Sequence, residues 1–563
     1  MKRFTNAALW LFELSVFALA LVGCQSSGGT VGARGSEGSA GGVPLFKGLG
    51  DHRRAVTTSS RLAQKYFDQG LIWTFAFNHD EAIRAYTEAA RIDPGCAMAW
   101  WGIAYANGPH INKPEVDAER SKAAWEAVQK AISLAPEASE VERSLIGALG
   151  TRYSADPSAD RKPLDEAYAK AMAEVFRLYS QDADVACLYA ESMMDLRPWD
   201  LWTKDGKPHP GTTTILGTLE QAIRLDPKHP GANHLYIHAT ESSPNPEKGV
   251  AAADRLHAGL VPAAGHLVHM PAHTYCRVGR WADACDANVR AKEADKKYRE
   301  VVPNQGFYRL YMAHNPHFLA WASMMEGRSA VSLAAAREVI NGVPAEYLKA
   351  NPFMDGFMTI ELEALMRFGR WDDILKVAEP PSYLPVTTCM WRFTRGVALA
   401  AKGEVEHAER ERELFNDALV RVPKDTPFGN NKAEQVLAIA AKVLNGEIAY
   451  RKKSIDVAVA ELSEAVKLED QLKYNESPDW IVPARHALGA ILVDAGRYAE
   501  AEKVYRDDLA VRPNNGWALY GLAKCLRTSG SPAEAAAVQA RFDRVWSRAD
   551  VRIDSSCLCV GKR

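Results

Sequence analysis

The same spacing of small residues, an aromatic residue and a proline occurs near both ends of this chain. Over residues 63–96 it consists of Gly70, Ala82, Tyr86, Ala89 and Pro94. Over residues 482–515 it consists of Leu488, Gly489, Ala501, Tyr505 and Pro513. Both copies fit a repeating unit of about 34 residues, in which small residues let two antiparallel helices approach closely. The chain is therefore expected to fold as an array of helical pairs, and the sequence shows no strand pattern.

This spacing resembles the tetratricopeptide repeat, whose helical hairpins stack into a right-handed superhelix. Weaker copies between the two ends are marked by a turn with glycine, at Gly279-Arg280-Trp281, Gly327-Arg328, Gly369-Arg370-Trp371, Lys402-Gly403 and Gly496-Arg497-Tyr498. A helix commonly ends at such a glycine. The resemblance implies an all-α solenoid with roughly ten to twelve helical pairs between residues 60 and 548.

Two loops rich in proline and glycine, residues 197–214 and residues 422–431, interrupt the helical pattern. Such loops are expected to divide the solenoid into lobes. We place an N-terminal solenoid over residues 56–421 and C-terminal repeats over residues 422–548, followed by a tail over residues 549–563.

The N-terminus has the pattern of an export signal. A short basic start precedes an apolar run over residues 7–22, which is typical of a secretory signal peptide. The run ends in Leu-Val-Gly-Cys, which resembles the lipobox of bacterial lipoproteins. The resemblance implies removal of residues 1–23, acylation of Cys24 by a lipid such as palmitate and, because Gln25 follows, an outer-membrane location that faces the periplasm. Glu13 departs from the pattern, and an ordinary signal or short anchor is the alternative.

The segment after the signal, residues 24–55, is rich in Gly and Ser and is expected to be a flexible tether. No later run approaches the ~20 apolar residues of a membrane helix, so we expect a soluble body attached to the membrane by its lipid alone. A net charge of −2 gives no reason to expect a nucleic-acid partner. Cys276 and Cys285 flank one helical turn, and the sequence leaves open whether they pair.

Seven of the 15 histidines lie in three short stretches at helical spacing. The stretches are HLYIHATE with His234, His238 and Glu241, GHLVHMPAH with His266, His269 and His273, and AHNPH with His314 and His317. Aligned by the turn glycines, these residues fall at the second, fifth, ninth and twelfth positions of the unit. Those positions form one stripe on a helix, rotated away from the stripe that packs against the partner helix. By the resemblance, this stripe lines the concave groove.

Histidines at matched positions on neighbouring helices are expected to meet in one site. Imidazole is the commonest metal-binding side chain, and packed helices lie about 8–10 Å apart. We therefore predict a metal site in the groove, with zinc favoured and iron or copper as alternatives. The ligands we expect are His238, His269 and His273, followed by Glu241, His317 and His234.

Further residues are expected at the same groove. Pro271 and Pro316 predict that two of the helices start late, because proline fits only the first turn of a helix. His266 and His314 would then lie on the incoming loops as outer members of the site. The preceding repeats are expected to add Glu191, Asp195 and His110.

Several segments, from AQKYFDQGL to HNPHFLAWASMMEGR, also resemble a group of bacterial tetratricopeptide proteins of unassigned function, a resemblance that implies no activity. The first hypothesis is a lipid-anchored binding or scaffold module with a groove metal and a protein or peptide partner. The second is a metal-dependent, hydrolase-like enzyme with Glu241 or Glu191 as base. The third is a metal-free peptide-binding scaffold. The sequence contains no phosphate-binding glycine loop and no nucleophile elbow, and it leaves the catalytic residues and enzyme status open.

Overall fold

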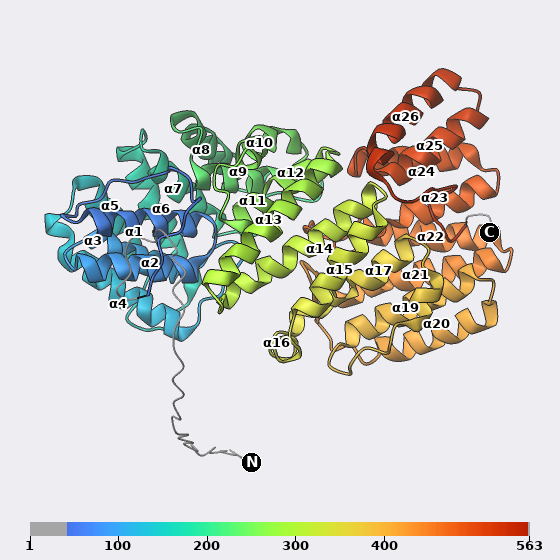
Figure 1. Ribbon diagram of the computed structural model, residues 1–563, viewed down its shortest axis with the longest axis horizontal. Coiled ribbons are helices and arrows are strands. Elements are labelled where there is room, and N and C mark those ends of the chain that lie inside the picture. The colour runs from blue at the N-terminus through green and yellow to red at the C-terminus, as the bar shows by residue number, and fades with distance from the viewer. Residues whose placement is uncertain (1–41, 561–563) are drawn as a thin grey trace, which may run out of the picture. The chain divides into compact units, whose positions relative to one another are not determined.

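The computed structural model describes residues 42–560, of which residues 45–560 form one compact unit (Figure 1). The N-terminal helices are α1 (Arg61–Phe75), α2 (His79–Ile92), α3 (Ala97–Ala106), α4 (Ala118–Leu134), α5 (Glu140–Gly150), α6 (Arg161–Leu178), α7 (Ala183–Met194), α8 (Thr212–Leu225), α9 (Pro230–Glu241) and α10 (Val250–His257). The central helices are α11 (Gly265–His269), α12 (Pro271–Arg277), α13 (Trp281–Val301), α14 (Arg309–Met325), α15 (Ser329–Gly342), α16 (Ala345–Ala350), α17 (Ile360–Arg367) and α18 (Trp371–Lys376).

The C-terminal helices are α19 (Pro385–Ala401), α20 (Val405–Leu419), α21 (Ala433–Arg451), α22 (Ile455–Glu469), α23 (Ala484–Asp494), α24 (Tyr498–Val511), α25 (Gly516–Thr528) and α26 (Pro532–Val545). The one sheet in the described part of the chain pairs β1 (Pro427–Phe428) with β2 (Asn431–Lys432). Counting α11 with α12 and leaving out α16, the helices form twelve successive pairs. The predicted all-α fold of helical hairpins is confirmed.

One turn geometry joins the two helices in eight of these pairs. In each turn a residue with positive φ is followed by a residue whose N–H donates to the carbonyl five positions back, as in Arg280 to Tyr275. This is the left-handed helix ending that glycine favours. The residues with positive φ are Phe77, Gly279, Gly327, Gly369, Gly403, Lys453, Gly496 and Gly530. The five glycine turns expected from the sequence are present, and Phe77 adopts the same conformation without being glycine.

A tyrosine between two glycines sets the packing of the repeat at both ends of the array. A Cβ atom on Gly70 or on Gly102 would lie 2.6 or 2.5 Å from the ring of Tyr86. Gly489 and Gly521 stand in the same relation to Tyr505, at 2.5 and 2.2 Å. The ring therefore rests on the bare backbone of the first helix in its own pair and of the first helix in the next. This contact explains the small residues in the sequence pattern.

Proline does not shorten the histidine helices as expected. Helix α14 begins at Arg309 and includes Pro316, so His314 lies inside the helix and not on a loop. Met270 has helical φ and ψ of −49° and −36°, so α11 and α12 continue one into the other across Pro271, and His266 is helical as well. Helix α12 does begin at Pro271, as predicted, but the short helix α11 precedes it; for α14 the prediction of a late start was wrong, because burial on nearly all sides holds the helix together despite the lost hydrogen bond.

The predicted signal, Cys24 and most of the tether lie outside the described residues. The end of the predicted tether is packed, since the N–H of Phe46 donates to Gln69 at 2.8 Å and Arg54 binds Asp182 at 2.9 Å. None of the helices in residues 42–560 is long and apolar enough to cross a membrane. Cys276 and Cys285 are free and buried, whereas Cys557 and Cys559 form a disulfide.

The close contact with Tyr505 predicts that Gly489→Ala destabilises the fold. The added methyl group would overlap the ring, which costs about 1–3 kcal/mol in the free energy of unfolding. Gly217→Ala in α8 is the matched control, because its Cβ would meet nothing within 4 Å. That change should stabilise the protein by up to about 1 kcal/mol. Denaturant unfolding of both variants measures the difference, and equal midpoints would contradict the packing described here.

Candidate functional site

Six of the seven histidines on α9, α11, α12 and α14 come together inside the protein. α9 packs against α12, and α11 packs against α14. The ring nitrogens form two groups, in each of which the ligand atoms lie within 4.8 Å of one another. The first group is His234, His238 and His266, and the second is His269, His273 and His314. Five of the six are at most 5% exposed, and His314 is half-buried.

Partners that only accept hydrogen bonds fix the orientation of two of these rings. The Nδ1 atom of His234 lies 2.7 Å from the carbonyl oxygen of Phe75. The Nδ1 atom of His269 lies 2.7 Å from Oδ1 of Asn288, whose amide nitrogen in turn donates to Ala284. An oxygen that only accepts requires the hydrogen to be on Nδ1. In a neutral ring the Nε2 atom then presents a lone pair toward the other histidines.

Glu241 orients one histidine of each group. Its Oε1 accepts from Nδ1 of His238 at 2.9 Å, and its Oε2 accepts from Nδ1 of His273. Burial alone raises the pKa of Glu241, but its interactions with His273 and His238 outweigh burial and lower this pKa below its usual range. The predicted ligand Glu241 therefore has both oxygens engaged by imidazole N–H groups.

The Nε2 atoms face one another at short distances. His269 and His273 place theirs 2.7 Å apart, and His234 and His266 place theirs 3.2 Å apart. Nε2 of His238 is buried and has no hydrogen-bond partner among the described residues. Because Nδ1 carries the hydrogen in both His269 and His273, their Nε2 lone pairs face each other without a donor, which is costly unless a cation or a proton lies there.

Burial also sets the protonation of the cluster. It lowers the pKa values of His234, His266, His269 and His314 well below the usual value, with a further contribution from their histidine neighbours. Neutral imidazole is the form that binds metals. At neutral pH the site thus offers nitrogen lone pairs and, in Glu241, a single carboxylate.

Four residues predicted at the site lie outside both groups. The ring of His317 hydrogen-bonds through Nδ1 to Ser477 at 2.8 Å, and burial lowers its pKa to about 4. Glu191 accepts from Tyr105 at 2.6 Å, and Asp195 pairs with Arg152 at 2.6 Å. His110 stacks on Phe77. Each of these side chains is bound by a residue other than the six histidines, so none of the four joins either group.

An aromatic wall that the sequence analysis missed encloses the first group. The centre of the Phe77 ring lies 4.4 Å from that of His234, and the centre of the Trp199 ring lies 5.4 Å from that of His238. The ring of Tyr311 is centred 4.3 Å from that of His266. Phe77 and Trp199 both have positive φ, at 55° and 59°, which is strained for bulky residues. The sequence could have singled out Phe77, because it occupies the turn position at which most other pairs have glycine.

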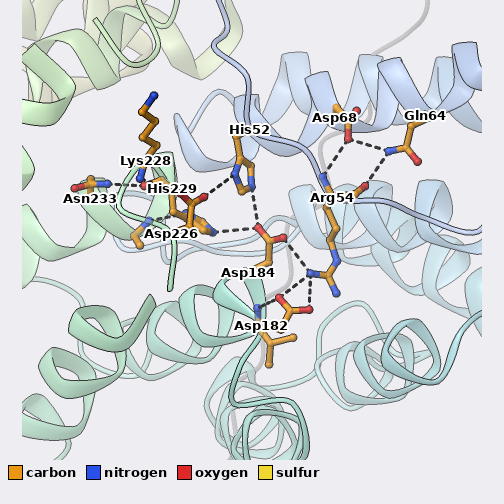
Figure 2. Close-up of polar contacts among 12 residues, drawn as sticks. His52, Arg54, Gln64, Asp68, Asp182, Asp184, Asp226, Lys228, His229 and Asn233 are labelled. Atoms are coloured by element: carbon orange, nitrogen blue, oxygen red, sulfur yellow. Dashed lines mark hydrogen bonds and ion pairs between the residues drawn. The ribbon is translucent and has the colours of Figure 1, made fainter. Parts of the chain in front are cut away.

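A third cluster, His52, Asp184 and His229, has the residue types of a metal site but a different arrangement. Figure 2 shows both imidazoles directed at Asp184, whose Oδ1 lies 2.9 Å from Nε2 of His52 and 3.1 Å from Nε2 of His229. Nδ1 of His229 accepts from the N–H of Ala232, so its Nε2 carries the hydrogen and donates. Arg54 donates to the other oxygen of Asp184 at 3.0 Å. These groups satisfy one another and tie the N-terminal segment to α7 and α9.

The network predicts that Asp184→Asn destabilises the protein at neutral pH. Burial raises the pKa of Asp184, but hydrogen bonds from His229 and His52 and the charge of Arg54 hold it well below its usual value. A lowered folded-state pKa contributes stability above the unfolded pKa of about 3.9, and this contribution is lost as pH falls through the folded value.

Denaturant unfolding at pH 7 should show a loss of about 3 kcal/mol for Asp184→Asn, as is typical of a broken buried ion pair. The difference in the free energy of unfolding between Asp184→Asn and the parent should become smaller below pH 4. Asp226→Asn is the control, because this carboxylate is 38% exposed and lies 3.6 Å from His52. It should change the free energy of unfolding by less than about 1 kcal/mol. Equal effects of the two changes at pH 7 would refute the structural role of Asp184.

Comparison with known proteins identifies the repeat. Residues 492–541 match the sequence model of the tetratricopeptide repeat family, which confirms the predicted family. No curated protein matches the chain. Among solved structures, a human IFIT1 dimer with m7Gppp-AAAA has a TM-score of 0.32 and 13% identity over 87% of this chain and 91% of that one. Yeast Tom70 has a TM-score of 0.27 and 12% identity over 86% and 91%. Scores this low carry no inference about function.

Proposed function

We propose that this tetratricopeptide repeat protein is a lipid-anchored scaffold of the bacterial cell envelope that binds a transition metal at its buried histidine site. The observation that carries the proposal is the convergence of imidazole nitrogen atoms from α9, α11, α12 and α14. A helical repeat array is suited to binding interactions, and we expect a protein or peptide partner in the concave groove. The membrane is contacted through the N-terminal lipid only, and no nucleic acid is involved.

The hydrogen-bond partners of the histidines favour a metal site over a cluster in which the histidines only hydrogen-bond to one another. Metal-binding histidines nearly always donate their other ring N–H to a carboxylate or a carbonyl, which fixes the ring. His238 and His273 donate to Glu241, and His234 donates to Phe75. The Nε2 lone pairs of His269 and His273 have no donor between them, and Nε2 of His238 has no partner among the described residues. Zinc is the favoured ion for such imidazole ligands, and copper and iron are the alternatives.

The arrangement favours a scaffold over a hydrolase. Hydrolysis at a metal ion needs a base with a free oxygen beside the bound water. Both oxygens of Glu241 are engaged by His238 and His273, and Glu191 accepts from Tyr105. Glu241 thus has no free oxygen, and Glu191 lies outside both histidine groups, so neither carboxylate is placed to act as the base.

Metal content tests the proposed site directly. The mature chain from Gly28, supplied with zinc, copper or iron and then dialysed, should retain a stoichiometric ion by elemental analysis. His269→Ala with His273→Ala should remove the ion from the second group, because no other side chain replaces these nitrogens. Bound ion should also raise the unfolding temperature of the parent.

The matched control is His52→Ala with His229→Ala, which removes two histidines from the satisfied network. This variant should keep the metal content of the parent, although its stability falls. A parent chain that retains no zinc, copper or iron would overturn the metal site and leave the metal-free peptide scaffold. Loss of metal in the control with circular dichroism unchanged would show that the ligands are elsewhere.

The lipid anchor is tested by Cys24→Ala. In a bacterial host the parent should fractionate with the outer membrane, because acylation attaches Cys24 to lipid. The variant should lose at least most of this membrane association, since two or more acyl chains are needed for stable anchoring. Gln25→Ala is the control and should stay with the membrane fraction. Unchanged fractionation of Cys24→Ala would refute the lipoprotein assignment.

A further inference from the structure

We infer that the histidine site holds two metal ions, each bound by three imidazoles, and not one. The inference rests on the proposed metal site and adds its stoichiometry and its ligand sets. The two groups of histidines share no member, and the ligand atoms within each group lie within 4.8 Å of one another. Six imidazoles exceed the four ligands that one zinc ion takes.

The first ion site lies between α9 and α11. His234 and His238 are one turn apart on α9, and His266 approaches from α11. Two nitrogens bound to one tetrahedral ion at 2.0–2.1 Å are separated by about 3.4 Å. The Nε2 atoms of His234 and His266 are separated by 3.2 Å, which fits this value. The buried, unpartnered Nε2 of His238 supplies the third ligand.

The second ion site lies between α11, α12 and α14. His269 and His273 are again one helical turn apart, and His314 comes from the neighbouring helix. The ring of His269 is centred 4.7 Å from that of His273 and 4.8 Å from that of His314. The Nδ1 atoms of His269 and His273 already donate to Asn288 and Glu241. Their Nε2 atoms face each other at 2.7 Å, so an ion bound between them would have to move them apart to about 3.4 Å.

Glu241 connects the two ion sites as a positioning residue. One oxygen holds His238 of the first set and the other holds His273 of the second. The rings of these two histidines are centred 5.5 Å apart, so the two sites are neighbours. A single negative charge between two cations reduces their repulsion and keeps both imidazoles in the orientation for binding.

The remaining coordination positions suit only small ligands. Three protein ligands leave a zinc ion one open position, which water usually fills. The rings of Phe77, Trp199 and Tyr311 lie against the first site, and its three histidines are at most 5% exposed. A peptide side chain is therefore kept from the first ion, and an exogenous ligand there is of the size of water or hydroxide.

Zinc titration of single variants tests the stoichiometry. Isothermal titration and elemental analysis should give about two zinc ions per mature parent chain, and about one for His266→Ala and one for His314→Ala. The double variant should bind none. His317→Ala is the matched control, because this histidine is on the same helix as His314 but is held by Ser477. It should keep both ions.

The outcomes separate the two proposals. One ion in the parent, lost in both His266→Ala and His314→Ala, would refute the two-ion inference and keep the proposed function. No ion in the parent would refute both. Circular dichroism and size-exclusion elution identify a variant that fails to fold, and for such a variant His266→Asn or His314→Asn takes its place.

Glu241→Gln tests the shared carboxylate. A glutamine accepts from one Nδ1 but presents its amide N–H to the other, so zinc affinity should fall by 10–100-fold. Glu241→Asp keeps a carboxylate and should recover part of the affinity, which a purely structural role would not predict. Unchanged zinc affinity in a folded Glu241→Gln chain would refute the bridging role.

Discussion

The left-handed turn between the two helices of a pair is the constraint that sets α12 and α14 in the same register at the histidine site. In eight of the twelve pairs its hydrogen bond reaches five residues back and ends the first helix at the same point of the repeat. Because these ends coincide, equivalent positions of α12 and α14 face the same side. Helix α9 lacks this turn and contributes its histidines by packing against α12. At the two ends of the array, Tyr86 and Tyr505 set how closely successive pairs approach through their contacts with glycine.

Phe77 is informative because it breaks the turn rule. A buried phenylalanine with φ of 55° costs free energy that glycine at the same position avoids. Its ring stacks on His110 and lies against His234, so the strained backbone places an apolar surface beside the histidines. Trp199 does the same from the loop before α8. Strain of this kind is retained where the surrounding packing determines it and where function benefits from it.

Periodicity in the sequence was sufficient for part of the site and insufficient for the rest. It predicted the helical pairs, the glycine turns and the common side of His234, His238, His269 and His273. Periodicity does not predict contacts between residues far apart in the sequence. Arg152 binds Asp195 across 43 residues, and Ser477 binds His317 across 160 residues. Pro271 and Pro316 did not place His266 and His314 on loops, because helix ends depend on burial as well as on backbone chemistry. The role of Glu241 in orienting His238 and His273 is visible only from its hydrogen bonds in the structure.

Residue types alone do not distinguish a metal site from a structural polar network in this protein. His52, Asp184 and His229 have suitable types, yet their hydrogens and lone pairs match one another, with His229 accepting from Ala232 and donating to Asp184. In the six-histidine cluster the Nδ1 hydrogens of His234, His238, His269 and His273 are taken up by outer acceptors, so the Nε2 lone pairs of these four rings point inward. A cation satisfies the second arrangement and would have to break hydrogen bonds to enter the first. The placement of the imidazole hydrogens therefore distinguishes a metal site from a structural polar network.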